Sequence, residues 1–146
     1  MTGSAAPGAL EGLRVLDLTR VLAGPVCTMM LGDMGADVLK VEPVGSGDDT
    51  RSWGPPFLGG ESAYFLGANR NKRGMTLNMA VPAGQEVLRR LIARSYVLVE
   101  NFRTGTLARW GFDAAWFDAN APHVVRCSIT GYGTTGPKAA MPGYDF

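Results

Sequence analysis

The chain has 146 residues, of which 46% are hydrophobic and 18% are charged, and its formal net charge is +1. This composition predicts a globular domain and argues against a disordered chain. The near-neutral charge predicts no nucleic-acid partner, and no apolar run reaches the roughly eighteen residues that a membrane span needs. Two cysteines far apart in the sequence, Cys27 and Cys127, favour a reducing, cytoplasmic location.

Residues 13–43 predict a complete strand–helix–strand unit. An apolar run opens it, and Pro25 suits the first turn of the helix because proline has no N–H to leave unpaired there. The helix is expected to carry Met30 and Met34 on one apolar stripe and to end near Gly35, before a second strand. The first turn of such a unit usually directs backbone N–H groups toward an anionic ligand.

Strands and helices alternate through the rest of the chain. Residues 44–60 are rich in Gly, Pro, Ser and Asp and predict a long loop, which is typical of a functional loop. The further expected elements are a helix at 61–69, a strand at 75–79, an amphipathic helix from Pro82, a strand at 96–100, helices at 106–110 and 114–119, and a strand at 124–129. This order predicts an α/β fold with a parallel sheet over residues 10–146, after a disordered tail at 1–9.

Several motifs argue against common kinds of site. The G-x-G-x-x-G at 131–136 follows a strand, but Pro137 comes next and too few residues remain for the acidic partner of a dinucleotide site. His123 is the only histidine, so neither a Ser-His-Asp triad nor a His/Cys metal site can be assembled. Carboxylates remain for covalent catalysis, although Asp48, Asp49 and Asp145 each fit a turn-stabilising role better.

Basic residues gather near the predicted strand ends and loops. Ligands of parallel sheets bind at the carboxyl ends of strands, and guanidinium groups there suit phosphates. Solvated surface charge is the alternative for each residue taken alone. The residues are Arg51, Arg70, Lys72, Arg73, Arg103 and Arg109.

A set of segments in fixed order resembles the class III CoA-transferases, the family of formyl-CoA transferase, carnitine CoA-transferase and alpha-methylacyl-CoA racemase. The segments are DLTRVLAGPVCTMMLGDMGADVLKVEP, GSGDDTRSWGPP, NRNKRGMTLNM, VLVENFRTG with LARWGF, SITGYGTTGP and GYDF. The resemblance implies the N-terminal part of a Rossmann-like large domain with helices flanking a parallel sheet. It also implies an interlocked homodimer for the full-length protein.

The resemblance implies a set of residues around coenzyme A. Leu77 would lie near the adenine and Arg109 near the phosphates, which agrees with the chemistry of an aliphatic wall and a guanidinium. Lys72 and Arg73 are further candidates on charge alone. The implied CoA contacts are Leu22, Ala23, Leu77, Asn101, Phe102, Arg109 and Tyr144. No metal and no cofactor are expected, because the CoA thioester is a substrate, with a carboxylic acid as its partner.

Some positions differ from the family members. Leu22 replaces a glutamine of formyl-CoA transferase, Pro43 a CoA-contacting arginine, and Pro142 a lysine, which argues against formate or oxalate as the acyl partner. The racemases carry His-Asp where this chain has Tyr144-Asp145, so one of the two acid/base groups of a racemase is missing. The sequence therefore favours a transferase.

The family's catalytic aspartate is expected beyond Phe146, so none of the 146 residues is predicted to be the nucleophile. The full enzyme would move CoA through an aspartyl intermediate, and this chain alone would be inactive. Two alternatives stay open. One is a non-catalytic CoA-binding fragment or split subunit that needs a second chain, and the other is a fragment of an acyl-CoA racemase.

Overall fold

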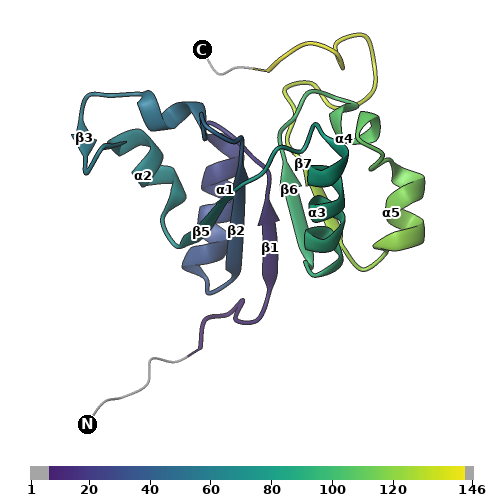
Figure 1. Ribbon diagram of the computed structural model, residues 1–146, viewed down its shortest axis with the longest axis horizontal. Coiled ribbons are helices and arrows are strands. Elements are labelled where there is room, and N and C mark those ends of the chain that lie inside the picture. Colours follow the sequence, from purple (N-terminus) through teal and green to yellow (C-terminus); the bar gives the residue numbers. More distant parts are fainter. Residues whose placement is uncertain (1–6, 144–146) are drawn as a thin grey trace.

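A parallel five-stranded sheet organises the chain in the computed structural model, which describes residues 7–143 (Figure 1). The strand order is β5-β2-β1-β6-β7, and every neighbouring pair runs parallel. The strands are β1 (Arg14–Asp17), β2 (Asp37–Glu42), β5 (Lys72–Thr76), β6 (Val97–Glu100) and β7 (Val125–Ser128). The predicted α/β class with a Rossmann-like parallel sheet is confirmed.

Helices lie on both faces of this sheet. Helix α1 (Ala23–Asp33) packs on one face and contacts α2 (Ala63–Asn69). Helices α3 (Pro82–Ala93), α4 (Thr106–Arg109) and α5 (Ala114–Asn120) lie on the other side (Figure 1). Within residues 7–143, no helix combines the length and the apolar character that crossing a membrane requires.

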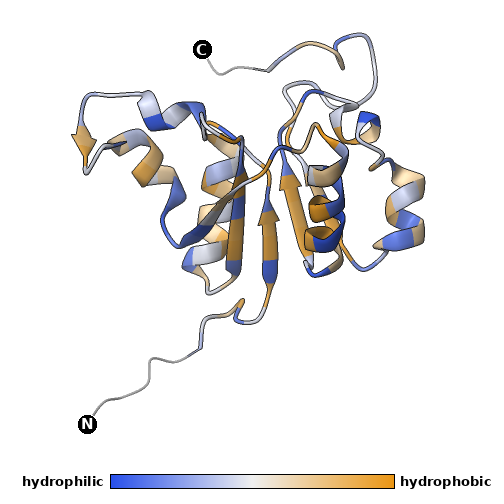
Figure 2. Cartoon of the chain, viewed as in Figure 1, coloured by the Kyte–Doolittle hydropathy of each residue, from blue (hydrophilic) through white to orange (hydrophobic). Residues whose placement is uncertain are grey.

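The core is divided between the two faces because successive side chains of a strand point in opposite directions. Leu16 and Leu98 point toward α3, where they join Leu88 and Ile92 in the larger cluster. Figure 2 shows the apolar strands between helices with polar outer surfaces. Leu88 and Ile92 are one helical turn apart, so the predicted amphipathic helix from Pro82 is confirmed.

Helix α1 turns a different face to the sheet than its sequence predicts. Met30 and Met34 are 56% and 43% exposed, whereas Thr28 and Met29 are buried. The Thr28 hydroxyl donates a hydrogen bond to Asp17 Oδ2 at 2.6 Å, which fixes the Thr28 side of the helix toward β1. The prediction that the stripe of Met30 and Met34 is the packed face was therefore wrong.

Two predicted segments differ in their bounds. The strand expected at 75–79 is β5 at Lys72–Thr76, because the buried lysine at its start pairs in register with β2. The loop expected at 44–60 contains a 3₁₀ helix, η1 (Asp49–Ser52), and the short strand β3 (Phe57–Leu58). Strand β3 pairs antiparallel with β4 (Glu61–Ser62), so this region is structured.

The tail expected at 1–9 is only partly described. Residues 1–6 lie outside the described residues. Gly8 accepts a hydrogen bond from Glu11 N at 3.0 Å, and Leu10 N donates to Met34 O at 2.9 Å. The segment before β1 is thus attached to the end of α1 from Gly8 onward.

Candidate functional site

The fold places a switch point between β1 and β6. The chain leaves β1 toward β2 and β5 on one side and later returns to form β6 and β7 on the other side. Open parallel sheets bind ligands outside the carboxyl ends of their strands at such a point. The turn after β1 (residues 18–22) and the loop after β6 (residues 101–105) meet there, and these segments carry several of the predicted CoA contacts.

Asn101 connects these two segments. Its Oδ1 accepts a hydrogen bond from Arg20 N at 2.9 Å, and its Nδ2 donates to Arg20 O at 2.7 Å. The next residue, Phe102, donates its N–H to Glu100 Oε2 at 2.7 Å, which orients the start of the loop. The side chain of Asn101 therefore holds the turn after β1, in addition to any ligand contact.

A buried carboxylate, Asp17, lies at the end of β1 beneath the turn. It accepts hydrogen bonds from Thr19 N at 2.9 Å, Thr19 Oγ1 at 2.5 Å and Lys72 Nζ at 3.0 Å. Lys72 Nζ also donates to Pro25 O and Asn69 Oδ1, so all three of its N–H groups are used inside the protein. Burial lowers the pKa of Lys72, and the Asp17 charge opposes this shift.

A second buried ion pair, Lys40 with Asp48, lies between β2 and η1. Lys40 Nζ lies 2.9 Å from Asp48 Oδ2 and 2.8 Å from Thr19 O. Asp48 also caps η1 by accepting from Thr50 N, which confirms its predicted turn-stabilising role. Burial opposes ionisation of Asp48, but the Lys40 charge and hydrogen bonds from Lys40 and Thr50 outweigh it and lower the pKa.

Glu42 and Arg51 form the outer part of a polar region that also contains Lys40 and Asp48. The Arg51 guanidinium contacts both Glu42 oxygens at 2.7 Å, reaches Glu61 at 2.7 Å and lies over the Phe65 ring. Burial opposes ionisation of Glu42, yet hydrogen bonds from Arg51 and the Asp48 amide hold its pKa below the ordinary value. Arg51, predicted as one of several phosphate candidates, is thus occupied within the protein.

A cavity of about 300 Å³ opens at the carboxyl ends of the strands, next to the turn after β1. Its apolar wall includes Leu77 and Phe102, two of the predicted CoA contacts, together with Leu18 and Trp110. The Phe102 and Trp110 rings meet edge to face, with centroids 5.4 Å apart. The structure thus brings Leu77 and Phe102 together, and it adds Trp110, which belongs to the LARWGF segment but was not among the predicted CoA contacts.

The remaining predicted CoA contacts that the structure describes do not line this cavity. Leu22 is the N-cap of α1 and Ala23 is its first residue, so both belong to the turn. Arg109 is exposed on α4, where its guanidinium donates to Thr106 Oγ1 at 2.9 Å. Tyr144 lies outside the described residues.

The two candidates proposed on charge alone gain no support. The Lys72 ammonium group is fully used by protein acceptors. Arg73 pairs with Asp37, the first residue of β2, and so reaches toward the opposite end of the sheet. Among residues 7–143, no cluster of three His, Cys, Asp or Glu side chains is placed to hold a metal ion.

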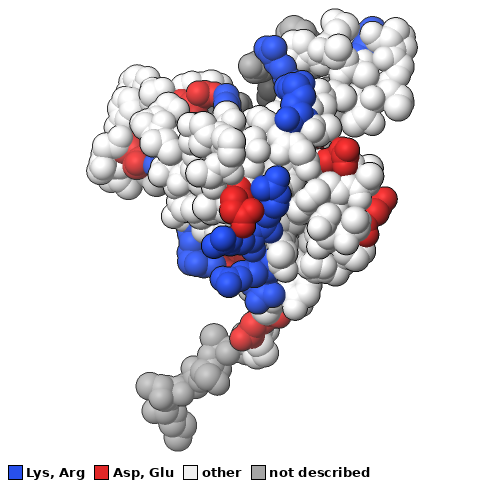
Figure 3. Space-filling model, turned by 45° about the vertical axis from the view of Figure 1, so that its right-hand side comes forward, with Lys and Arg blue, Asp and Glu red and all other residues white. Residues whose placement is uncertain are grey.

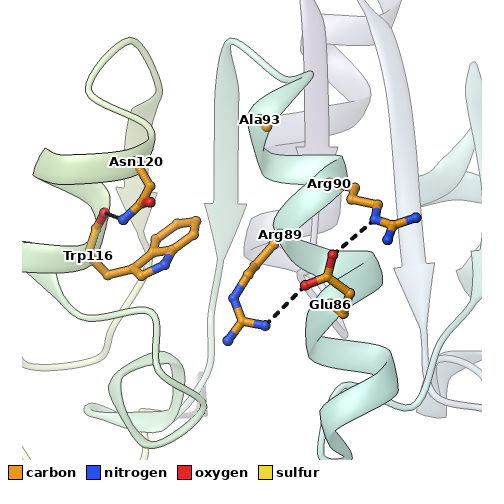
Figure 4. A pocket seen from close by; sticks show the side chains of 6 residues that line it. All are labelled: Glu86, Arg89, Arg90, Ala93, Trp116 and Asn120. Carbon is orange, nitrogen blue, oxygen red and sulfur yellow. Dashed lines mark hydrogen bonds and ion pairs between the residues drawn. The ribbon is translucent and has the colours of Figure 1, made fainter.

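A second pocket, of about 410 Å³, lies between α3 and α5 (Figure 4). Glu86 pairs there with both Arg89 and Arg90, at 3.4 and 3.0 Å, and Trp116 closes the far side. Figure 3 shows a mainly basic patch on one face, with an acidic group at its edge, and a further basic group near the end toward which the strands point. None of the predicted site residues lines this second pocket.

The family model described as CoA-transferase family III matches residues 10–146. The chain belongs to this family. Among solved structures, a CaiB/BaiF family protein from Brucella suis is similar with a TM-score of 0.90 and 46% identity. That likeness covers 96% of this chain and 38% of the Brucella chain, and a protein from Mycobacterium tuberculosis has a TM-score of 0.88 with 34% identity.

Curated relatives in the family are CoA-transferases by name. The chain is 55% identical to the succinyl-CoA:glutarate CoA-transferase of Mus musculus and 47% identical to the succinate--glutarate CoA-transferase of Agrobacterium fabrum. These matches cover 93% and 94% of this chain but 31% and 36% of the relatives. The chain thus spans about a third of the length of the curated relatives it matches.

Proposed function

We propose that this chain forms the CoA-binding part of an enzyme that transfers coenzyme A between an acyl-CoA thioester and a carboxylic acid. The observation that carries the proposal is the cavity at the carboxyl ends of the strands. It combines an aliphatic and aromatic wall of Leu77, Phe102 and Trp110 with the turn after β1. Ligand sites of parallel sheets lie at this position, and membership of the family points to coenzyme A as the ligand.

The adenine ring and the phosphates of coenzyme A each have a proposed place. The adenine ring lies against Leu77 and the Phe102–Trp110 pair, because a flat ring gains from apolar contact and edge-to-face packing. The exposed guanidinium of Arg109 contacts the phosphates, since its planar fork matches phosphate oxygens. Leu22 and Ala23 offer the main chain at the start of α1, where the helix dipole favours negative charge.

The proposed chemistry needs a carboxylate nucleophile, which we place outside residues 1–146. An aspartate oxygen attacks the thioester carbonyl, and the C–S bond breaks to release CoA thiolate and leave an aspartyl anhydride. The thiolate then attacks the aspartyl carbonyl, which releases the first acid and leaves an aspartyl-CoA thioester. The acceptor carboxylate repeats the two steps in reverse order, so aspartate is regenerated.

The acceptor acid is proposed to be a dicarboxylate. The two relatives named above carry succinate and glutarate in their names and share about half of their aligned residues with this chain. Within the proposal, the full-length enzyme is an interlocked homodimer, as the sequence resemblance implies. Cys27 and Cys127 are free thiols, which supports a reducing compartment such as the cytoplasm.

Isothermal titration of the 146-residue chain with CoA tests the proposal. We expect saturable binding that Phe102→Ala weakens by about fivefold or more, because an aromatic–base contact contributes about 1–3 kcal/mol. Trp116→Ala is the matched control, since Trp116 lines only the pocket between α3 and α5. Absence of binding by the folded wild type, or equal losses in both variants, would contradict the proposed site.

A further inference from the structure

Side chains from distant segments, together with Asp17 just before it, hold the turn after β1. Thr19 N binds Asp17, Thr19 O accepts from Lys40, and Arg20 N and O both bind Asn101. Val21 N faces both carboxylate oxygens of Asp48, at 3.3 and 3.4 Å. The conformation of the turn therefore depends on residues up to 81 positions away in the sequence.

Val21 adopts a backbone conformation that its side chain disfavours. Its φ is +71°, a region that β-branched residues rarely enter because Cβ approaches the backbone. Such a conformation persists only where surrounding contacts enforce it, and strained residues of this kind occur often at ligand sites. Asp48 supplies one of these contacts directly, through the Val21 N–H.

The Lys40–Asp48 pair is almost completely buried. The side chains are 2% and 0% exposed. A buried ion pair is often no more stabilising than a well-packed apolar pair of similar volume, because two charges must be removed from water. An apolar pair, however, could not form hydrogen bonds with Thr19 O and Val21 N, the main-chain groups that Lys40 and Asp48 contact.

We propose that Lys40 and Asp48 are positioning residues that hold the turn after β1 (residues 18–22) in its strained conformation for binding CoA. Lys40, on β2, and Asp48, at the start of η1, contact the turn from one side, and Asn101 contacts it from the β6 side. Neither is proposed to contact CoA itself. The inference rests on the proposed CoA site, and it adds a cause for the geometry of that site.

The test compares wild type with the double variant Lys40→Met/Asp48→Leu, which replaces the pair by apolar side chains of similar volume. Three quantities are measured: urea unfolding, CoA affinity by titration, and the three-bond HN–Hα coupling of Val21, which reports φ. We expect a folded variant whose CoA affinity falls by about tenfold or more, because small misplacements of a binding loop are costly. The Val21 coupling should move away from its wild-type value.

Control variants separate positioning from general damage. Glu61→Gln removes the Arg51–Glu61 pair, which belongs to the same polar region but does not touch the turn, and should leave affinity and the Val21 coupling unchanged. Should the double variant fail to fold, Asp48→Asn replaces it. This single variant keeps an acceptor for Thr50 and removes the charge that holds Lys40, and it should show the same two changes.

Two outcomes overturn the inference. One is a folded variant that binds CoA as tightly as wild type. The other is a Val21 coupling that stays at its wild-type value while Lys40 and Asp48 are replaced. Failure of wild type to bind CoA would contradict the proposed function instead, and the Val21 coupling would still decide whether the pair holds the turn.

Discussion

Asn101 binds the main chain of Arg20 through two hydrogen bonds, one to the N–H at 2.9 Å and one to the carbonyl at 2.7 Å. The two residues follow β6 and β1, the neighbouring parallel strands between which the strand order changes from one side of β1 to the other. A primary amide is the side-chain group that can accept from a peptide N–H and donate to the carbonyl of the same residue. Asn101 therefore links the loop after β6 to the turn after β1.

Asn101→Asp should destabilise the fold. A carboxylate keeps the size of the side chain and still accepts from Arg20 N, but it cannot donate to Arg20 O and places an oxygen against it. We expect a loss of about 1–3 kcal/mol in the free energy of unfolding, measured with urea. Asn120→Asp is the control, because Asn120 donates to the Trp116 carbonyl on the exposed surface of α5. Equal losses in both variants would contradict the role given to Asn101.

The packing of α3 can be tested within one helix. Leu88 is fully buried, and Leu88→Ala should lower the free energy of unfolding by about 2–5 kcal/mol because it leaves a cavity under the helix. Val87 precedes it and is 38% exposed, so Val87→Ala should cost well under half as much. Similar losses for the two variants in urea unfolding would mean that α3 packs through another face.

Acid should destabilise the fold through Glu42 and Asp48. Both carboxyl groups have a pKa below the ordinary value, so the unfolded chain binds more protons than the folded chain as the pH falls. The stability that they contribute is present above their unfolded pKa values of about 4 and is lost as the pH falls toward their folded values.

A variant isolates the contribution of Asp48 to this pH dependence. Asp48→Asn should lower stability at neutral pH and flatten its loss below about pH 4, in unfolding curves measured against pH. Asp49→Asn serves as the control, since Asp49 is half exposed and pairs with Arg20 at the surface. Curves for Asp48→Asn that run parallel to those of wild type would contradict the assignment.

The 146-residue chain is expected to show no CoA-transfer activity by itself. We place the nucleophilic aspartate outside these residues, and the sequence favours a turn-stabilising role for Asp145. The measurement is the transfer of CoA from succinyl-CoA to glutarate by the purified chain, followed as formation of glutaryl-CoA and succinate. Turnover that Asp145→Asn abolishes would contradict the prediction and would make Asp145 the nucleophile.

The sequence predicted the elements well where burial and hydrophobicity coincide. Leu88 and Ile92 repeat at helical spacing and are buried, so α3 was predicted from Pro82 onward. Helix α1 also exists as predicted, but the face predicted to pack on the sheet was wrong. The hydroxyl of Thr28 binds a buried carboxylate and turns another face inward. Periodicity counts Thr28 as polar and Met30 as apolar, and it cannot register a hydrogen bond to Asp17.

The candidate site was only partly predictable for a similar reason. Leu77 and Phe102 came from the family resemblance, and the structure places both on one cavity. Lys72 was predicted as a CoA contact on its charge alone, yet its side chain is buried and its ammonium group pairs with Asp17 at 3.0 Å. Trp110 is the C-cap of α4, and only the fold brings its ring against Phe102 at the cavity.

A crystal structure of the chain with bound CoA tests the central claim most directly. The account predicts the adenine ring against Leu77 and the Phe102–Trp110 pair, with the phosphates beside Arg109 and the turn of Leu22 and Ala23. Coenzyme A bound instead between α3 and α5, in the pocket of Glu86 and Arg89, would contradict it (Figure 4).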